Sequence, residues 1–286
     1  MKIALVGNND GPLRFYNQLV KTEVQILYVG LQNRPEDTSL ENSYKGLDVP
    51  VSYDIDEQKM LEDLLNIEPD IIINIFCNFI FKKSLLYYTI LNYHLSPLPR
   101  YRGRHPMHWA LINGEKTFGS TVHFMNEKID DGAIVLESTL NVPDRCSVQN
   151  LRELLICDME TKLHTLPKLL IDPTHDFKIN DISEATYVLR RFPEDSQLKE
   201  WDEPERIYRK IWALSSESNA AYLMIKEKRY EVKSARFEKK QFEGVSTPTI
   251  YKVDKKHIYV ATKSGLSLIL KLDNHDLKPN TKIDFR

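Results

Sequence analysis

Residues 92–109, NYHLSPLPRYRGRHPMHW, bring amide, imidazole, proline and guanidinium groups together in one short stretch. Asn92 and His94 are two positions apart, so in a β-strand their side chains would lie on the same face. The prolines that follow restrict φ, and Gly103 permits a tight turn. The stretch therefore predicts a polar pair held rigidly at the end of a strand.

A carboxylate is available from the later loop MNEKIDDG, which contains Asp130 and Asp131. An amide, an imidazole and a carboxylate together suit acyl transfer to an amine. The amide donates a hydrogen bond to the developing oxyanion, the imidazole takes the amine proton, and the carboxylate orients the imidazole. An Asn and a His at a strand end are also typical of a purely structural role, so the spacing alone leaves both interpretations open.

The elements that must position these groups alternate along the first part of the chain. Apolar runs predict strands at 2–7, 23–31, 70–76, 89–95, 119–125 and 133–142, and apolar spacing predicts helices within 7–20, 56–68, 82–88 and 147–170. This alternation indicates an α/β fold with a Rossmann-like, mostly parallel sheet and helices on both faces. Ligands of such sheets bind at the carboxyl ends of the strands, where Asn92 and His94 are expected. The first turn, GNNDG, lacks the G-x-G-x-x-G spacing of a nicotinamide or flavin site.

The alternation of predicted strands and helices ends at about residue 172. An irregular polar connection leads to a helix within 203–216, and strands are predicted at 229–237, 247–253, 256–265 and 266–272. We expect a catalytic domain at 1–175, a linker and helix at 176–218, and a small C-terminal β-rich domain at 219–286. The exposed strand edges of such a domain make a homodimer plausible.

Composition narrows the function classes. The chain has 286 residues and a net charge of −2, so the basic excess typical of nucleic-acid binding is absent and no nucleic-acid partner is expected. The apolar runs are too short to span a bilayer, and MKIALVG leads directly into a strand pattern, so neither a membrane partner nor a signal peptide is expected. Cys77, Cys146 and Cys157 lack metal-ligand spacing. We expect a reduced cytoplasmic protein without a metal.

Residues 91–135, LNYHLSPLPRYRGRHPMHWALINGEKTFGSTVHFMNEKIDDGAIV, resemble the signature of formyltransferases that use 10-formyltetrahydrofolate. The resemblance implies that Asn92 and His94 are catalytic, and the family's spacing from the His to its Asp selects Asp130 rather than Asp131. Residues 69–86 resemble the strand and loop that surround the folate in this family. By position, the folate-binding residues would be Phe76, Asn78, Phe79, Ile80 and Asp130.

The resemblance continues through residues 185–201, 205–216 and 258–272, and so covers nearly the whole chain. It implies N10-formyltetrahydrofolate as the formyl donor and no metal. The sequence departs from the family at Trp212, where Arg is frequent, and in the loop at 215–222. Because that region helps to build acceptor pockets in the family, the resemblance says least about the acceptor.

Three subgroups share the catalytic signature. Glycinamide ribonucleotide enzymes usually lack such a β-domain, and methionyl-tRNA formyltransferases carry a basic insertion where residues 31–51 are short and acidic. The chain looks most like enzymes that formylate nucleotide-linked 3- or 4-amino-dideoxyhexoses for surface polysaccharide of the O-antigen type, with dTDP-linked sugars favoured. Candidate sugar-nucleotide contacts are Asn8, Asn9, Arg102, His105, Trp109 and Tyr222. A methionyl-tRNA formyltransferase, a folate-binding module and a formate-releasing hydrolase are the alternatives.

Overall fold

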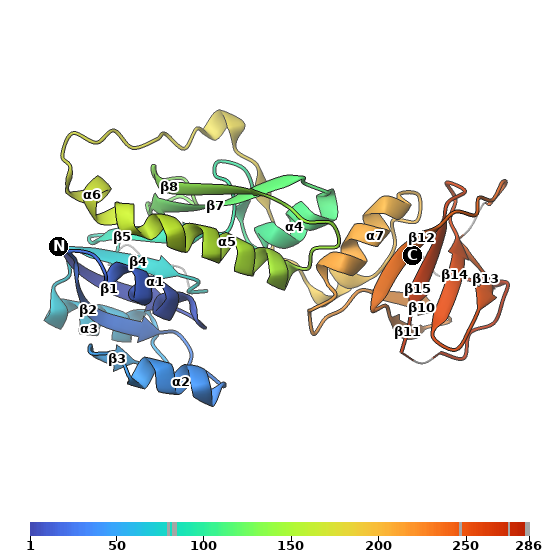
Figure 1. Ribbon diagram of the computed structural model, residues 1–286, viewed down its shortest axis with the longest axis horizontal. Coiled ribbons are helices and arrows are strands. Elements are labelled where there is room, and N and C mark those ends of the chain that lie inside the picture. The colour runs from blue at the N-terminus through green and yellow to red at the C-terminus, as the bar shows by residue number, and fades with distance from the viewer. Residues whose placement is uncertain (79–80, 82–84, 246–247, 274, 284–286) are drawn as a thin grey trace. The chain divides into compact units, whose positions relative to one another are not determined.

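The computed structural model describes residues 1–78, 81, 85–245, 248–273 and 275–283 (Figure 1). The chain divides into two compact units. The first contains Met1–Gly103, Phe118–Leu140 and Leu154–Tyr187, and the second contains Arg104–Thr117, Asn141–Glu153 and Val188–Arg286. Each unit is described by itself.

A mostly parallel sheet forms the centre of the first unit, as the sequence predicts. Within the described residues it has seven strands in the order β3-β2-β1-β4-β5-β7-β8. Their bounds are Val51–Ser52, Gln25–Leu31, Lys2–Gly7, Ile71–Ile75, Thr89–His94, Thr117–Phe124 and Ile134–Asn141. Pairing is parallel from β3 to β5, whereas β7 runs antiparallel to β5. Because β7 is antiparallel, its carboxyl end lies beside the amino-terminal half of β5, and the loop that follows it turns back to bring Asp130 to His94.

Helices cover both faces of this sheet. Successive residues of β1 point to opposite sides, so Ile3 and Leu5 belong to one core, whereas Ala4 and Val6 belong to the other. The first core is closed by α1 (Gly11–Leu19) and α5 (Val148–Lys162), and the second by α3 (Glu57–Ile67). Figure 1 shows α1 and α5 on the same side of the strands. The predicted α/β architecture is confirmed.

Some elements differ from the sequence prediction. The single helix expected at 147–170 is broken into α5, a 3₁₀ turn (Leu163–Thr165) and α6 (Leu166–Ile171), because Pro167 cannot donate the backbone hydrogen bond that would continue the helix. Of the helix expected at 82–88, residues 85–88 form a turn and bend, and 82–84 lie outside the described residues. The sequence analysis did not predict α2 (Thr38–Lys45), which Asp37 caps by accepting from the Leu40 N–H.

The second unit combines two helices, α4 (Pro106–Asn113) and α7 (Pro204–Ala213), with antiparallel strands. The hairpin β10 (Tyr222–Ile225) and β11 (Lys228–Glu231) turns through Lys226 and Glu227, both at positive φ. The strand predicted at 229–237 is interrupted at residues 232–233, between β11 and the next strand. Within the described residues, a second sheet has five strands in the order β12-β15-β14-β13-β16. Their bounds are Ser234–Glu238, Ser267–Lys271, His257–Ala261, Thr249–Val253 and Thr281–Lys282.

The small β-rich C-terminal domain is therefore confirmed. In the described part of the chain, no helix is both long enough and apolar enough to cross a lipid bilayer.

Candidate functional site

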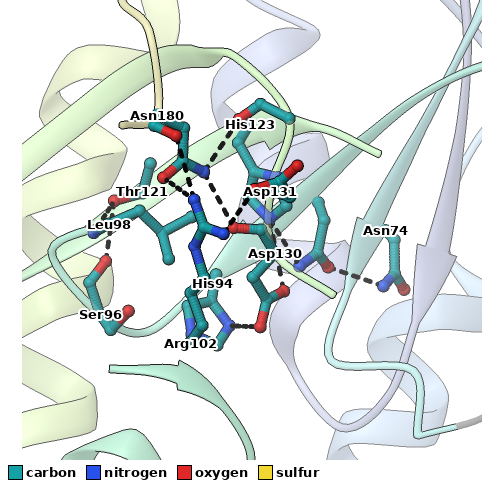
Figure 2. Close-up of polar contacts among 12 residues, drawn as sticks. Asn74, His94, Ser96, Leu98, Arg102, Thr121, His123, Asp130, Asp131 and Asn180 are labelled. Carbon is teal, nitrogen blue, oxygen red and sulfur yellow. Dashed lines mark hydrogen bonds and ion pairs between the residues drawn. The ribbon is translucent and has the colours of Figure 1, made fainter. Parts of the chain in front are cut away.

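Three polar residues form a row across the sheet of the first unit. The strand register pairs Asn74 of β4 with Asn92 of β5, and pairs Asn92 with His123 of β7. Paired residues share a face of a sheet, so the three side chains lie side by side. Figure 2 labels the two ends of this row, Asn74 and His123, together with Asp130. Asn74 and His123 are buried, and Asn92 is half-buried.

Backbone groups at both ends fix the direction of the hydrogen bonds in this row. The Cys77 N–H, which can only donate, donates to Asn74 Oδ1 at 3.2 Å. Asn74 Nδ2 must then be the donor to Asn92 Oδ1, at 2.8 Å. At the other end, His123 Nδ1 lies 2.8 Å from the Phe124 carbonyl oxygen, which can only accept.

It follows that His123 carries its proton on Nδ1 and that its Nε2 accepts from Asn92 Nδ2 at 3.1 Å. The Asn92 amide therefore has one orientation, and its second N–H remains available to a substrate oxygen. This is the arrangement that an oxyanion donor requires.

His94 is held as a neutral base. Its Nε2 lies 3.1 Å from the Tyr101 carbonyl oxygen and must carry the proton, so Nδ1 is bare and faces Asp130 Oδ2 at 3.7 Å. Burial lowers the pKa of His94, and the neighbouring Asp130 carboxylate only partly offsets this. Neutral His94 can accept a proton at Nδ1, where the Asp130 carboxylate would stabilise the resulting imidazolium.

Asp130 is ionised although it is largely buried. Burial raises the pKa of its carboxyl, but His94, His123 and the Gly103 N–H outweigh this effect and hold the pKa at about 2. Asp130 Oδ2 accepts from the Gly103 N–H at 2.8 Å, and Oδ1 lies 3.6 Å from His123 Nε2. Gly103 has a φ of 101°, which a side chain would disfavour, so glycine is required where the backbone approaches Asp130.

The adjacent carboxylate has a different partner. Asp131 forms an ion pair with Arg102, whose side chain is fully buried. The same guanidinium donates to Tyr187 Oη at 3.1 Å and to Asn180 Oδ1 at 2.7 Å. Asn180 Nδ2 in turn donates to the backbone oxygen of Asp130 at 2.8 Å. This network fixes the loop that presents Asp130, as Figure 2 shows.

The placement of Arg102 argues against its predicted contact with a diphosphate. A guanidinium with no exposed surface, already bonded to a carboxylate, a hydroxyl and an amide, has no route to a bound ligand. The sequence pattern placed Arg102 in a turn, but its partner Asn180 comes from a segment 78 residues away. Arg102 instead supports the Asp130 loop from inside the protein.

The other predicted residues of the first unit lie at the carboxyl ends of β1 and β4. Asn8 is nearly buried and accepts from the Asn9 N–H at 3.0 Å, and the Asn9 carbonyl accepts from Tyr44 at 2.6 Å. Phe76 has a φ of 72° and its ring centroid lies 5.6 Å from that of Tyr93. The Asn78 N–H donates to Gln32 Oε1 at 2.7 Å. Phe79 and Ile80 lie outside the described residues.

Three predicted residues belong to the second unit. His105 Nδ1 accepts from the Arg191 N–H at 2.9 Å, and burial together with nearby cationic groups lowers its pKa to about 4. Trp109 Nε1 donates to the Leu189 carbonyl at 2.8 Å. The Tyr222 residue is only 8% exposed, and Arg229 lies over its ring at 4.2 Å. This cover argues against the predicted contact of the Tyr222 ring with a sugar nucleotide.

The structure thus brings Asn92, His94 and Asp130 together and adds residues that sequence reasoning missed. Asn74 carried a weak signal, as a polar residue inside the apolar run IIINIF. The sequence places His123, in the segment GSTVHF, near the cleft as a secondary polar residue, but gives no sign of its direct contact with Asn92. Asn180 gave no signal, because its role depends on a long-range contact. Within the described residues, no group of three or more His, Cys, Asp or Glu could hold a metal.

Comparisons with known proteins agree on the family. The pattern described as Formyl transferase matches residues 44–163, and that described as Formyl transferase, C-terminal domain matches residues 193–285. Methionyl-tRNA formyltransferase of Clostridium tetani is 31% identical over 229 residues, which cover 78% of this chain and 73% of that protein.

Two further proteins extend the comparison. Bifunctional polymyxin resistance protein ArnA of Wigglesworthia glossinidia brevipalpis is 32% identical over 213 residues. These residues are 70% of this chain, but the chain spans only 31% of the length of ArnA. The N-formyltransferase of Helicobacter canadensis, solved with folinic acid and dTDP-3-aminofucose, superposes with a TM-score of 0.74 at 15% identity, covering 95% of this chain and 99% of that one.

Proposed function

Because this chain belongs to the formyl transferase family, we propose that it transfers a formyl group from N10-formyltetrahydrofolate to the amino group of a nucleotide-linked amino-dideoxyhexose. The observation that carries this proposal is the juxtaposition of a neutral imidazole, an ionised carboxylate and an oriented amide. His94 Nδ1 faces Asp130 Oδ2 at 3.7 Å, and the Asn92 amide is fixed in the same cluster. These are the groups that acyl transfer to an amine requires.

Each group has a distinct role in the proposed reaction. Asn92 donates its second amide N–H to the formyl oxygen as negative charge develops there, and one such donor contributes about 3 kcal/mol. His94 takes the proton that the attacking amine loses. Asp130 stays ionised and stabilises the imidazolium that His94 becomes, and His94 would return that proton to N10 of tetrahydrofolate as the bond between N10 and the formyl carbon breaks. His123 and Asn74 position Asn92 without touching the substrate.

The donor site would use residues at the carboxyl ends of β4 and β5. When bound, N10-formyltetrahydrofolate supplies the formyl carbon as the electrophile. Half-buried Phe76 lies at the end of β4 and its ring contacts Tyr93, which offers an apolar wall for a planar pterin. A Cβ on Gly11 would lie 2.8 Å from the Phe76 ring, so glycine is needed there for Phe76 to keep this position. Phe76 and Asn78 thus fit the predicted folate site.

The segment after β2 supports a small acceptor. In this segment, where methionyl-tRNA enzymes carry a basic insertion, the chain forms the short helix α2. Residues 31–51 contain more carboxylates than cations, and both cations, Arg34 and Lys45, pair with Glu41, at 2.9 and 3.0 Å. A surface that binds the phosphate backbone of a tRNA needs more cations than carboxylates. The solved relative that binds dTDP-3-aminofucose also matches nearly the full length of this chain.

A methionyl-tRNA formyltransferase is the second candidate, favoured by the 31% identity to the Clostridium tetani enzyme. The discriminating experiment offers the purified full chain N10-formyltetrahydrofolate with a panel of dTDP- and GDP-linked 3-amino and 4-amino dideoxysugars, and methionyl-tRNA alongside. Mass spectrometry measures the formylated product, and tetrahydrofolate formation measures turnover. Formylation of a sugar is the expected result.

Formylation of methionyl-tRNA alone would replace the proposal with the second candidate. Formate release without an acceptor would indicate a hydrolase instead. His94→Ala should remove most turnover, because it removes the imidazole that accepts the amine proton. Folate binding should stay nearly intact. His164→Ala, a change at an exposed histidine on a distant turn, is the matched control and should keep the wild-type rate.

A further inference from the structure

A hollow on the second unit carries chemistry that the proposed reaction does not use. It lies on one face of the five-stranded sheet, where the register pairs Ser234 with Lys271 and Lys271 with His257, and pairs Arg236 with Ile269 in the next row. Paired residues share a face, so the sheet presents these side chains together. The hollow has a volume of about 290 Å³.

An aromatic ring completes this hollow. Trp212, near the end of α7, lines it and donates from Nε1 to the Ala235 carbonyl of β12 at 3.1 Å. Arg145 lies with its guanidinium carbon 5.6 Å from the centre of the Trp212 ring and donates to Tyr208 Oη at 3.0 Å. The ring is thus fixed against the sheet with a cation on it.

The charge of the hollow is one-sided. Among the described residues, its lining contains the cations Arg145, Arg236 and Lys271 and no carboxylate. Among the residues that the structure describes, no ion-pair partner and no side-chain hydrogen-bond partner is found for Arg236 or Lys271. Asp254 is nearby, but its Oδ1 is engaged with the ring and backbone N–H groups of His257. A concave surface with cations of one sign concentrates anions.

An adjacent hollow shows that this asymmetry is specific. It has a volume of about 190 Å³ and shares Arg145 and Trp212. Its lining pairs cations with carboxylates, because Lys116 and Arg209 occur with Glu115, Asp144 and Glu205. Only the first of the two hollows is therefore suited to an anion.

We propose that the concave face formed by Arg145, Trp212, Arg236 and Lys271 binds a nucleoside phosphate. The phosphate contacts Arg236 and Lys271, and the base lies beside Trp212, since an aromatic ring can stack on any base. The size of the hollow is at the lower end of small-molecule cavities and suits one nucleotide. A nucleic-acid strand needs a continuous basic track, whereas here the adjacent lining is acidic as well as basic.

The test titrates the full chain at low salt with adenosine, guanosine, uridine and thymidine 5′-diphosphates, with inorganic pyrophosphate and with uridine. Calorimetry measures affinity and stoichiometry, and hydrogen exchange locates binding. Nucleotide should protect β12 and β15, which contain none of the catalytic residues or candidate acceptor contacts, so the protected strands distinguish this site from the acceptor site. Arg236→Glu with Lys271→Glu should weaken binding here about tenfold or more. Lys239→Glu with Lys255→Glu is the matched control, because it changes the net charge equally on exposed positions outside the hollow.

Trp212→Leu addresses the aromatic part. It should weaken nucleotide binding and leave the affinity for pyrophosphate unchanged, and a thermal melt checks that the variant is folded. Unchanged affinity in the Arg236/Lys271 double variant, or no protection of β12 and β15, would overturn the proposal. Binding of single-stranded RNA without binding of any nucleotide would overturn it in favour of a nucleic-acid surface.

Discussion

The fixed direction of the hydrogen bonds across β4, β5 and β7 makes Asn74→Asp a sharp test of the site. The side chain barely changes in size, but a carboxylate cannot donate. It could still accept from the Cys77 N–H, yet it would then place an acceptor 2.8 Å from Asn92 Oδ1, where Asn74 now donates. Two acceptors at that distance repel each other, so the Asn92 amide would turn over and donate toward the new carboxylate.

The turned amide places its oxygen toward His123 Nε2, which must then take up a proton and donate to it, and withdraws its N–H groups from the developing oxyanion. Losing one such donor costs roughly 100- to 1,000-fold in kcat, or about 2.7 to 4 kcal/mol of transition-state stabilisation. KM should change little, because the contact strengthens only as charge develops. Single-turnover transfer from N10-formyltetrahydrofolate to the acceptor found in the panel measures the effect.

Asn150→Asp is the matched control, since Asn150 is exposed in the first turn of α5 and should tolerate a carboxylate. On an Asn92→Ala background, Asn74→Asp should cause no further loss, because no amide remains to be turned. A wild-type kcat in the Asn74→Asp variant would refute the assigned hydrogen-bond direction. An equal loss on both backgrounds would show that Asn74 acts by a route other than Asn92.

Three further predictions concern the charged groups of the site. Asp130→Asn keeps an acceptor for the Gly103 N–H but removes the charge beside His94, so kcat should fall and the acid limb of the pH–rate profile should move to lower pH; an unmoved limb would contradict the pairing. Asp131→Asn leaves the buried Arg102 without its counter-ion, so the free energy of unfolding in urea should fall by roughly 3 kcal/mol. Because burial lowers the pKa of His94 below the ordinary 6.5, the transfer rate should stay level as the pH falls through 6.5 and decline only below it. The unfolded chain takes up that proton first, so His94 should also reduce stability as the pH falls below 6.5, and a His94→Gln variant should lack this part of the pH dependence.

The sequence predicted those parts of the protein that depend on local pattern. Apolar runs were sufficient for six of the seven described strands of the α/β sheet, because central strands such as β1 and β4 are buried on both faces and read as continuous apolar segments. The two-residue strand β3 was not predicted. Asn92 and His94 could be assigned to one face of one strand from their spacing alone. The family signature then selected Asp130 from two adjacent aspartates, and the structure brings that residue to His94.

The remaining features depend on contacts between distant segments. Asn74 reaches Asn92 only through the register of two parallel strands, which spacing along the chain does not encode. Arg102 looked accessible within its turn, but Asn180 and Asp131 enclose it. Tyr222 was a candidate contact for a sugar nucleotide, but Arg229 of the partner strand in the hairpin lies over its ring. In each case the missing information was a partner from elsewhere in the chain.

The network around Arg102 also has a consequence for the order in which parts of the protein fold. The sheet can close with residues up to about 171, but the Asp130 loop is held by Asn180, and the turn at Tyr101 is held by the Thr186 hydroxyl at 2.8 Å. These contacts close loops of 50 to 85 residues, which are slow to form compared with local contacts. During refolding, secondary structure should therefore return before catalysis. The segment that contains Asn180 and Thr186 docks last, and we expect catalytic activity to appear only after it has docked on the folded sheet.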